Sequence, residues 1–512
     1  MDRKWWTLTA VLIGVFMLLL DVTIVNVALP DIQRDLGSSF SDLQWVIDAY
    51  ALTLASTLLV SGSVADLIGR RRVFVIGLVV FSLASLGCGL VSTPLHLNLF
   101  RGAQGIGGGM MFATSLALIA QAFQGRERGT AFGAFGAVTG ASVAVGPVLG
   151  GVLTDAFGWQ AVFLVNIPVG VFAVALTLIK VAESRDPNPA GIDFPGAVTL
   201  TGSLFLLIFA LVRGNDEGWG STQIVAFLTG AAVLLAAFVA IETRRENPLF
   251  DLTLMRKPAF LGASLAAFCL SAAMFAMFLY LTLYLQGVLD YSPLEAGVRF
   301  LPVSVLSFLV GPIAGRLSER VPVRTLMGGG LTLVGLGLIL MHGVTASDDW
   351  TTLLAGFLVA GVGVGLVNPP LASTAIGVVE QRRSGMASGI NSTFRQVGLA
   401  TGIAALGAVF QHRVGMAVTD GLAGTPAAGR ADQFASAVTA GATEKAAAAA
   451  PAPMRGQLIE LGHEAFISGM NTLLVVTAAV ALVGAIGSAV LVRQRDFVAH
   501  GAPAPEPQKA AA

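Results

Sequence analysis

The chain alternates between long apolar stretches and short polar connections. Fourteen of the stretches are long enough to cross the roughly 30 Å hydrocarbon core of a bilayer as helices. They fall at 7–29, 45–65, 73–92, 98–121, 131–153, 160–181, 195–213, 222–242, 259–285, 297–316, 325–342, 352–376, 387–411 and 466–492. The pattern predicts an all-α polytopic membrane protein. The first stretch is too long for a signal-peptide core and no small-residue cleavage site follows it, so we expect it to be retained as a span.

Composition supports the same class of protein. Of the 512 residues, 55% are hydrophobic and only 12% are charged, against about 25% charged in ordinary soluble domains. The formal net charge is zero, so no basic excess is present to displace the counterions of a nucleic acid, and we expect no nucleic-acid partner. Cys88 and Cys269 both lie in apolar stretches, which argues against a disulfide framework or a cysteine metal site.

Lysine and arginine predict the orientation. An even number of spans puts both termini on one side, and the segments on that side carry a large excess of basic residues. These residues are Arg3, Lys4, Arg70 to Arg72, Arg126, Arg128, Lys180, Arg185, Arg244, Arg245, Arg256, Lys257, Arg316, Arg320, Arg324, Arg382, Arg383, Arg493 and Arg495. The short segments on the other side hold little beyond Arg34, Arg213 and Arg299. We therefore expect both termini in the cytoplasm, and the alanine and glycine content suggests a bacterial plasma membrane.

An internal repeat divides the chain into halves. Gly105, Gly107 and Gly109 recur 256 residues later as Gly361, Gly363 and Gly365, and the loop from Gly62 to Arg71 is echoed more weakly by 315–324. Two six-span repeats, spans 1–6 and 9–14, with spans 7 and 8 inserted, are the duplicated architecture of a rocking transporter. We expect an N-terminal bundle at 1–186, the inserted spans at 187–245, a C-terminal bundle at 246–495 and a disordered tail at 496–512.

The fifth span carries a stripe of small residues. Gly129, Gly133, Gly136, Gly140, Ala144, Pro147 and Gly151 are spaced by three or four residues and so follow one side of a helix. Glycine costs about 1 kcal/mol relative to alanine within a helix, which close approach to a neighbouring membrane helix can offset. The plainer interpretation is generic tight packing between two membrane helices.

Five local patterns carry a resemblance to a known family. They are LDVTIVNVALP (20–30), GSVADLIGRRR (62–72), RGAQGIGGG (101–109), the span 5 stripe ending in GPVLGG (146–151), and WQAVFLVNIPVG (159–170). The chain resembles the fourteen-span drug:proton antiporters of the major facilitator superfamily over essentially its whole length. That resemblance implies a proton-coupled exporter of small amphipathic drugs or antibiotics, and it implies an antiporter motif at Gly136, Gly140, Gly146, Pro147, Gly150 and Gly151. Asp48 departs from it, since many relatives carry an uncharged residue there.

Two aspartates are the candidates for proton coupling. Asp21 lies about nine residues, or roughly 13 Å, inside Pro30 and hence near the bilayer midplane, where an aspartate costs about 2.5–3.5 kcal/mol. It should face an internal cavity and be protonated or paired for much of the time. The alternative is a structural aspartate that never exchanges its proton. Asp48, nearer the outer end of its span, is the second candidate, with a simple interfacial charge as the alternative.

Arg101 in span 4 needs a partner, and its depth allows Asp48 or Asp21. The resemblance also assigns the span 4 arginine to proton transfer, whereas a snorkelling anchor at the outer interface is the alternative. Arg395 and Gln396 in span 13 are a second buried polar pair, for which functional and packing roles are equally open. The candidate substrate-cavity residues are Asn26, Gln104, Asn166, Arg395 and Gln396.

The loop after the second span is the candidate inner gate. Its basic residues are explained by topology alone, but the resemblance implies a latch made by Gly62, Asp66, Gly69, Arg70 and Arg71, with the acid facing a helix N-terminus. The outer segment 412–464 is too polar to span a membrane. It is either a lid over the outer opening or a tolerated linker.

Rival functions find less support in the sequence. No glycine precedes any lysine, so a GxxxxGK[ST] phosphate loop is absent, and His463-Glu464 lacks the second histidine of a zinc-protease motif. We therefore expect no enzyme, no cofactor and no metal site. A proton-coupled nutrient importer of the same fold is the serious alternative, and a solute sensor is a distant one. We expect a monomer in membrane lipid. We also expect a neutral or monocationic amphipathic substrate, because the acidic residues of the spans lie only in the N-terminal half.

Overall fold

A computed structural model shows an elongated bundle of helices, with no strand in the part of the chain that it describes. The structure describes residues 2–497 except 124, 186–192, 246–247, 249, 319, 380–383 and 494–495. Within helices, the side-chain surroundings of 59, 125–126, 128–130, 132–133, 136–137, 140, 143–144, 216, 376 and 384–385 also lie outside the described part. The predicted all-helical class is confirmed. The expected tail falls almost wholly outside the described residues.

The N-terminal half consists of α1 (Arg3–Leu36), α2 (Phe40–Ile68), α3 (Arg70–Leu90), α4 (Pro94–Ala122), α5 (Gly125–Phe157), α6 (Ala161–Leu164) and α7 (Asn166–Lys180). Local chemistry sets several of the boundaries. α1 ends where Gly37 adopts a φ of 63°, and α2 begins with a capping box in which Ser39 and Asp42 satisfy each other's backbone amides. We call the end of the bundle with this α1–α2 turn the distal end, and the end with the N-terminus the proximal end.

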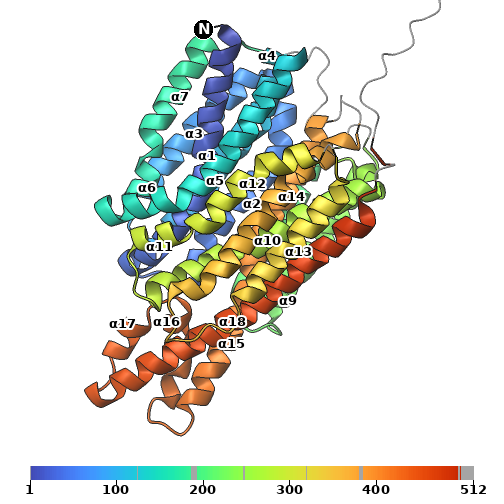
Figure 1. The fold of residues 1–512 in the computed structure, drawn as a ribbon. Helices are drawn as coiled ribbons and strands as arrows, with labels where there is room; N and C mark the ends of the chain where they lie inside the picture. The colour runs from blue at the N-terminus through green and yellow to red at the C-terminus, as the bar shows by residue number, and fades with distance from the viewer. Residues whose placement is uncertain are drawn as a thin grey trace, which may run out of the picture.

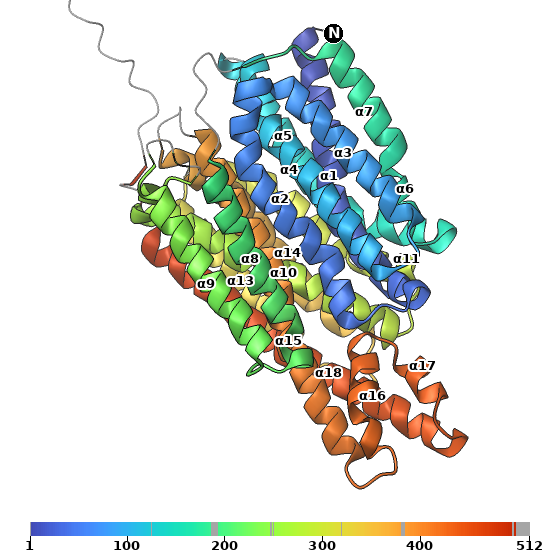
Figure 2. The same ribbon diagram turned by 180° about the vertical axis from the view of Figure 1, so that it is seen from behind.

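Two inserted helices, α8 (Phe194–Glu217) and α9 (Thr222–Glu242), lie along one flank, where α8 packs against α2 and α15 (Figure 2). The C-terminal half follows. It contains η1 (Leu252–Arg256), α10 (Pro258–Gly287), α11 (Pro293–Arg299), α12 (Leu301–Leu317), α13 (Val323–Leu340), η2 (Trp350–Leu353), α14 (Leu354–Gly377), α15 (Ser384–Leu422), η4 (Ala428–Arg430), α16 (Ala431–Thr439), α17 (Thr443–Ala448) and α18 (Ala452–Leu491). Figure 1 shows the two halves side by side.

Twelve of the described helices are long and apolar enough to cross a membrane. A thirteenth follows if the two parts of α2, Phe40–Leu58 and Val60–Ile68, which are bent by 49°, form one span, and the described part of α5 counts only as a shorter apolar helix, Val145–Phe157. Each of the fourteen predicted stretches falls on helical structure. The number fourteen and the domain boundaries nevertheless stay predictions.

The sequence repeat corresponds to a repeat in packing. A Cβ at Gly107 of α4 would lie 2.7 Å from the Gly77 carbonyl oxygen of α3, and a Cβ at Gly363 of α14 would lie 2.5 Å from the Gly330 carbonyl oxygen of α13. Real Cβ atoms essentially never approach that closely. The glycines that recur at an offset of 256 therefore allow the same close helix crossing in each half.

The segment 412–464 is a packed helical unit at the distal end (Figure 1). α15 continues to Leu422, beyond the predicted end of its span, and α18 begins at Ala452, before the predicted start. Between them, α16 and α17 pack against α18, with Phe434, Val438 and Leu458 buried. The segment is therefore folded and has buried apolar residues of its own, and whether it serves as a lid or as a tolerated linker stays open.

Candidate functional site

Asp21, Arg101, Gln104 and Asn166 form one buried network inside the N-terminal half. Arg101 on α4 forms an ion pair with Asp21 on α1, and its Nη1 also donates to Gln104 Oε1 at 2.7 Å. The second Asp21 oxygen accepts from Gln104 Nε2 at 2.8 Å and from Asn166 Nδ2 at 3.1 Å. Asp21 and Gln104 are 0% exposed and Arg101 is 1% exposed. A charge pair with further hydrogen bonds is the form in which ionised groups are tolerated inside a membrane protein.

Sequence reasoning missed two members of this network. Ser85 Oγ accepts hydrogen bonds from Gln104 Nε2 at 3.2 Å and from Asn166 Nδ2 at 3.0 Å. The Arg101 guanidinium stacks on Tyr50, with Cζ 4.3 Å from the ring centroid. A serine in an apolar helix gives little signal, because its hydroxyl commonly bonds to its own helix backbone. Tyr50 gives little signal because an aromatic residue in a span is ordinarily explained by packing.

The network decides between the alternatives for Arg101. A snorkelling anchor at the interface is wrong, because the guanidinium is fully buried and engaged by Asp21 and Gln104. We expected Asp21 to face an internal cavity. Instead, hydrogen-bond donors from α4 and α7 enclose its carboxylate. The reason is that α3, α4 and α7 together supply enough polar groups to satisfy the carboxylate within one half. Whether Asp21 exchanges a proton stays a prediction.

Asp48 lies apart from this network, where α2 meets the C-terminal half. Four residues before it, Gln44 Nε2 donates to the Ile403 carbonyl oxygen of α15 at 2.9 Å, across the boundary between the halves. Asp48 is 0% exposed, so the interfacial-charge interpretation is wrong. Neither of its oxygens has a hydrogen-bond partner among the described residues, and neither does the hydroxyl of Tyr280 on α10. The site therefore holds a carboxyl that no described side chain of opposite charge compensates.

The remaining substrate-cavity candidates are dispersed. Gln104 and Asn166 belong to the Asp21 network, while Asn26 Nδ2 bonds back to the Val22 carbonyl oxygen of its own helix at 3.3 Å. Arg395 on α15 is half-buried and donates through Nη2 to Asn368 Oδ1 on α14. Asn26 Oδ1 and Gln396 Oε1 are buried with no partner among the described residues. The candidates from the sequence thus fall into two groups. Those in the Asp21 network have their hydrogen-bonding groups satisfied by one another, and the others keep hydrogen-bonding groups without a described partner.

The described part of the span 5 motif lies between the two halves. A Cβ at Gly150 would lie 2.7 Å from the Ile24 carbonyl oxygen of α1, and a Cβ at Gly151 would lie 2.6 Å from Leu294 Cα of α11. On the other side, a Cβ at Gly297 of α11 would lie 2.9 Å from the carbonyl carbon of Pro147. The glycines therefore permit backbone contact between α1, α5 and α11. Gly136 and Gly140 lie within α5, but their side-chain surroundings are outside the described part.

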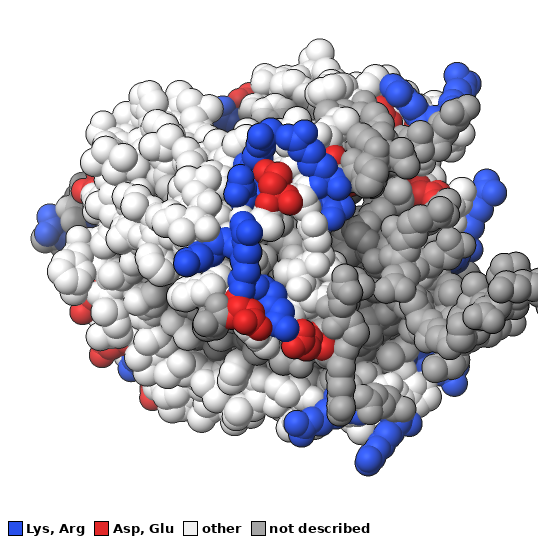
Figure 3. Space-filling model, turned by 90° about the horizontal axis from the view of Figure 1, so that it is seen from above, with Lys and Arg blue, Asp and Glu red and all other residues white. Residues whose placement is uncertain are grey.

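The predicted inner gate is at the proximal end, where basic and acidic side chains gather (Figure 3). Asp66 at the end of α2 accepts from Arg70 Nη2 at 2.9 Å and from its Nε at 3.1 Å, and both side chains are partly exposed. A Cβ at Gly62 would meet open space. The described partner of Asp66 is thus the side chain of Arg70, one helical turn away, and not the N-terminus of a helix.

Glu183, which sequence reasoning missed, occupies that helix N-terminus. Its Oε1 accepts from the backbone amide of Arg71 in the first turn of α3 at 3.0 Å, and its Oε2 lies 3.7 Å from the Nε atoms of Arg71 and Arg72. Gly69 has a φ of 118°, and a Cβ there would lie 2.6 Å from Glu183 Oε1. The loop needs glycine at this position both for its backbone conformation and for the close approach of the acid.

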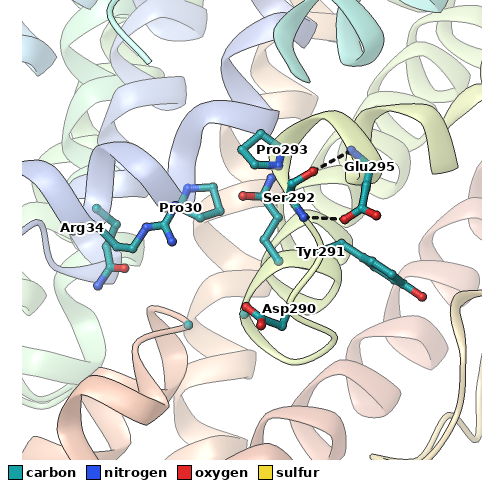
Figure 4. A pocket seen from close by; sticks show the side chains of 11 residues that line it. Pro30, Arg34, Asp290, Tyr291, Ser292, Pro293 and Glu295 are labelled. Carbon is teal, nitrogen blue, oxygen red and sulfur yellow. Dashed lines mark hydrogen bonds between the residues drawn. The ribbon is translucent and has the colours of Figure 1, made fainter. Parts of the chain in front are cut away.

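A pocket of about 360 Å³ opens at the distal end between the halves (Figure 4). Pro30 and Arg34 line it from α1, and Asp290 and Tyr291 line it from the α10–α11 connection. The hydrogen bond that the Tyr291 hydroxyl donates to Asp349 raises the pKa of Tyr291, with a smaller contribution from burial. Asp290 has a φ of 54°, so this connection holds a strained backbone at the boundary between the halves.

The described side chains offer little for covalent or metal chemistry. Within the described ranges, no three His, Cys, Asp or Glu residues lie close enough together to hold a metal ion, and Cys88 and Cys269 are free and buried. What the arrangement offers chemically is a set of buried charged and hydrogen-bonding groups on facing helices. Such groups bind ions, protons and polar solutes.

Comparison with known proteins agrees with this arrangement. The Major Facilitator Superfamily model matches residues 11–403. The Stp multidrug resistance protein of Mycobacterium tuberculosis is 38% identical over 409 residues, covering 79% of this chain and 75% of that protein. A tetracenomycin C resistance and export protein of Streptomyces glaucescens is 32% identical over 488 residues, covering 94% and 90%. The puromycin resistance protein pur8 of Streptomyces alboniger is 37% identical over 413 residues, covering 80% and 82%.

A solved structure supports the fold alone. The crystal structure of a bacterial homologue of the human lysosomal transporter Spinster, in an inward-facing and unoccupied conformation, superposes with a TM-score of 0.64. It is 18% identical and covers 97% of this chain and 98% of that one. Family, fold and the charged groups inside the helical bundle agree: the chain is a multi-pass membrane transporter and belongs to the Major Facilitator Superfamily.

Proposed function

We propose that this transporter is a proton-coupled antiporter that exports small amphipathic drugs or antibiotics across the plasma membrane by alternating access. The observation that carries the proposal is the Asp21–Arg101 ion pair, buried within the N-terminal half beside a glycine-lined contact between α1 and α5. The direction of transport is supported by the relatives, one of which is named for resistance and export. The proximal end, with its basic residues, is then the cytoplasmic side.

Protonation of Asp21 would weaken its pairing with Arg101. A neutral carboxyl keeps its hydrogen-bonding oxygens but loses the Coulomb attraction to the guanidinium, so Arg101 would be left as an uncompensated buried charge. α1 and α4 would then favour another arrangement. A second ligand that stabilises the new arrangement couples its own binding to that of the proton.

The packing gives this change a route to the other half. The contact between α5 and α1 lies at Thr23 and Ile24, two and three residues after Asp21. The same stretch of α5 touches α11 through Pro147 and Gly151. A displacement of α1 would therefore move α5 and reach the contact between the two halves. At the glycines the backbones touch directly, so no flexible side chain absorbs the movement.

One proton supplies enough free energy for export. A charge that crosses about 100 mV gains about 2.3 kcal/mol, which corresponds to a concentration ratio of roughly fifty-fold at 1.36 kcal/mol per tenfold. A single carboxyl thus suffices. Asp48 would be a second coupling group at the boundary between the halves, and Asp66 with Arg70 would strengthen closure at the proximal end. We expect the unit to be a monomer in lipid.

Reconstitution tests the proposal. Purified full-length protein in liposomes should move a fluorescent amphipathic dye against its gradient when a pH gradient is imposed, with proton flow in the opposite direction. A protonophore should stop the uphill movement. Uphill movement of dye with the proton, in the same direction, would identify an importer. Dye movement that only ever equilibrates would show a uniporter, and the proposal would fail.

A further inference from the structure

Arg395 is a charge that the C-terminal half does not compensate. It lies about 16 Å from the beginning of α15, well inside the predicted span 387–411. Its guanidinium makes one described hydrogen bond, to Asn368 Oδ1 on α14, and none of the ion pairs among the described residues includes it. A guanidinium has five N–H donors, so most of this hydrogen-bonding capacity is unused by the protein.

The same side of α15 carries a second unused donor. Asn391 lies four residues before Arg395 and hence one turn away on the same face. Asn391 is 5% exposed, and its Nδ2 has no acceptor among the described residues. A buried donor without an acceptor costs about 1–3 kcal/mol, and Asn391 Nδ2 is such a donor. Together with the free donors of the partly exposed Arg395, it points to an acceptor that comes from outside the protein.

No acid of the surrounding helices pairs with Arg395 among the described residues. α15 packs against α10, α14, α18, α2 and α8. α10 and α14 have no Asp or Glu anywhere in their sequences, and the acids of α18, Glu460 and Glu464, lie in its distal first turns. On α2, Gln44 bonds at the level of Ile403, and α2 runs antiparallel to α15, so Asp48, one turn further along, lies near the level of Leu399. That level is about four residues, or roughly 6 Å, along α15 from Arg395. Asp48 nevertheless forms no hydrogen bond and no ion pair with Arg395 among the described residues.

We propose that Arg395, with Asn391 and Asn368, is the substrate-recognition position of this transporter, and that it takes an anionic oxygen of the substrate, a carboxylate or an ionised phenol. The planar fork of arginine binds such oxygens in a bidentate manner. This inference rests on the proposed function and specifies its substrate class. It replaces the sequence-based expectation of a neutral or monocationic substrate, which considered the distribution of acids alone.

The position also explains why the arginine is tolerated. An occupied site pairs the guanidinium, and an empty one leaves Arg395 half-buried with a single amide contact. Occupancy therefore stabilises the C-terminal half in the bound state. Asn368 holds the guanidinium in place between substrates, from a helix that carries Pro369 and Pro370 immediately after it.

Three xanthene dyes with one aromatic core test the substrate class: fluorescein, its methyl ester with the phenol oxygen also methylated (the ester below), and rhodamine 6G. At neutral pH they present a carboxylate with an ionised phenol, a neutral molecule and a cation. Binding to the purified full-length protein is measured by fluorescence polarisation, and transport is measured in liposomes. We expect wild type to bind fluorescein about tenfold or more tightly than the ester, and Arg395→Gln to lose that preference while binding the ester as before. Arg395→Lys should keep part of the preference, because it retains charge without the fork.

The matched control is Arg413→Gln, an exposed arginine on the same helix, which should behave as wild type. Asn391→Ala, a change without loss of charge, should weaken fluorescein binding by a smaller factor. If wild type binds all three dyes alike, favours rhodamine 6G or binds none, the substrate class is wrong. Driven transport of rhodamine 6G without binding of fluorescein would support the proposed function and contradict this inference. Selective binding of fluorescein without driven transport of any dye would support this inference on the substrate class and contradict the proposed function.

Discussion

Each half contains an arginine within a predicted span, and the two arginines have opposite surroundings. In the N-terminal half, Arg101 is saturated by Asp21, by Gln104 and by the ring of Tyr50, all supplied by the protein. In the C-terminal half, Arg395 has one amide partner and spare donors. An arginine paired with a carboxylate, such as Arg101, loses its partner's charge when the carboxylate is protonated. An arginine without an acidic partner, such as Arg395, is free to bind an anionic solute. Under the proposed function, coupling would belong to the N-terminal half and substrate recognition to the C-terminal half.

The largest effect is expected from Asp21→Asn, which should abolish driven efflux. The amide removes the exchangeable proton and leaves Arg101 as an uncompensated buried charge, which should destabilise the fold by about 3–5 kcal/mol. Dye efflux in liposomes and thermal unfolding in detergent measure the two effects. The double variant Asp21→Asn with Arg101→Gln should recover most of the stability and none of the driven efflux. Recovery of pumping in the double variant would remove the ion pair from the coupling mechanism.

Gly150→Leu should block turnover next most strongly. A side chain there meets the backbone of α1 near Ile24, and overpacking of this kind typically costs 1–3 kcal/mol, concentrated in the states where α1 and α5 touch. Single-turnover dye release reports the block. Gly329→Leu is the matched control, because a Cβ there meets open space on an exposed face. Equal rates for the two leucine variants would make the motif incidental to the cycle.

Asp48→Asn should change stability in the opposite direction to Asp21→Asn. Asp48 has no described partner to lose, so replacing its buried carboxyl should stabilise the fold by about 1–3 kcal/mol. Driven efflux should fall several-fold without vanishing, as expected of a second coupling group. Thermal unfolding together with the number of protons moved per dye checks both points, with the exposed Asp420→Asn as control. A destabilised Asp48→Asn protein would mean that this carboxyl has a partner.

Asp66→Asn and Arg70→Ala should have the smallest effect. The pair is partly exposed and spans one helical turn, so it contributes about 0.2–1 kcal/mol, which corresponds to roughly a one- to fivefold shift between conformations. Cysteine accessibility at the proximal and distal ends measures that shift. Glu183→Gln, which removes the acid bonded to the first turn of α3, should shift it further. The latch interpretation fails if both ends label as in wild type while transport is impaired.

The fold was predictable from the sequence because membrane spans follow from local apolar length. The glycines at 105, 107 and 109 and their counterparts 256 residues later also indicated the repeat, since small residues mark close helix crossings in either half. The helical unit within 412–464 was not predicted. Its core depends on small contacts among alanine-rich turns, which hydropathy does not distinguish from a polar loop.

The site was predictable in its charged members and not in its geometry. An aspartate and an arginine within apolar spans are conspicuous, so Asp21 and Arg101 were identified. Which acid pairs with Arg101 depends on the rotation of α1 and α2, which sequence spacing does not fix. Glu183 was missed because it follows the end of α7 and becomes a helix-terminal ligand of α3 only after the chain folds back. Ser85 was missed because a serine hydroxyl in an apolar helix commonly bonds to its own helix backbone.

The division of labour between the two halves is tested most directly by one side-by-side measurement. Efflux of fluorescein and of its neutral methyl ester, methylated also at the phenol oxygen, is driven by a pH gradient and recorded in liposomes that contain wild type, Asp21→Asn or Arg395→Gln. Asp21→Asn should lose driven transport of both dyes, whereas Arg395→Gln should lose transport of the acid and keep that of the ester. If the two variants lose the same dyes to the same extent, coupling and recognition are not separated between the halves, and the account is contradicted.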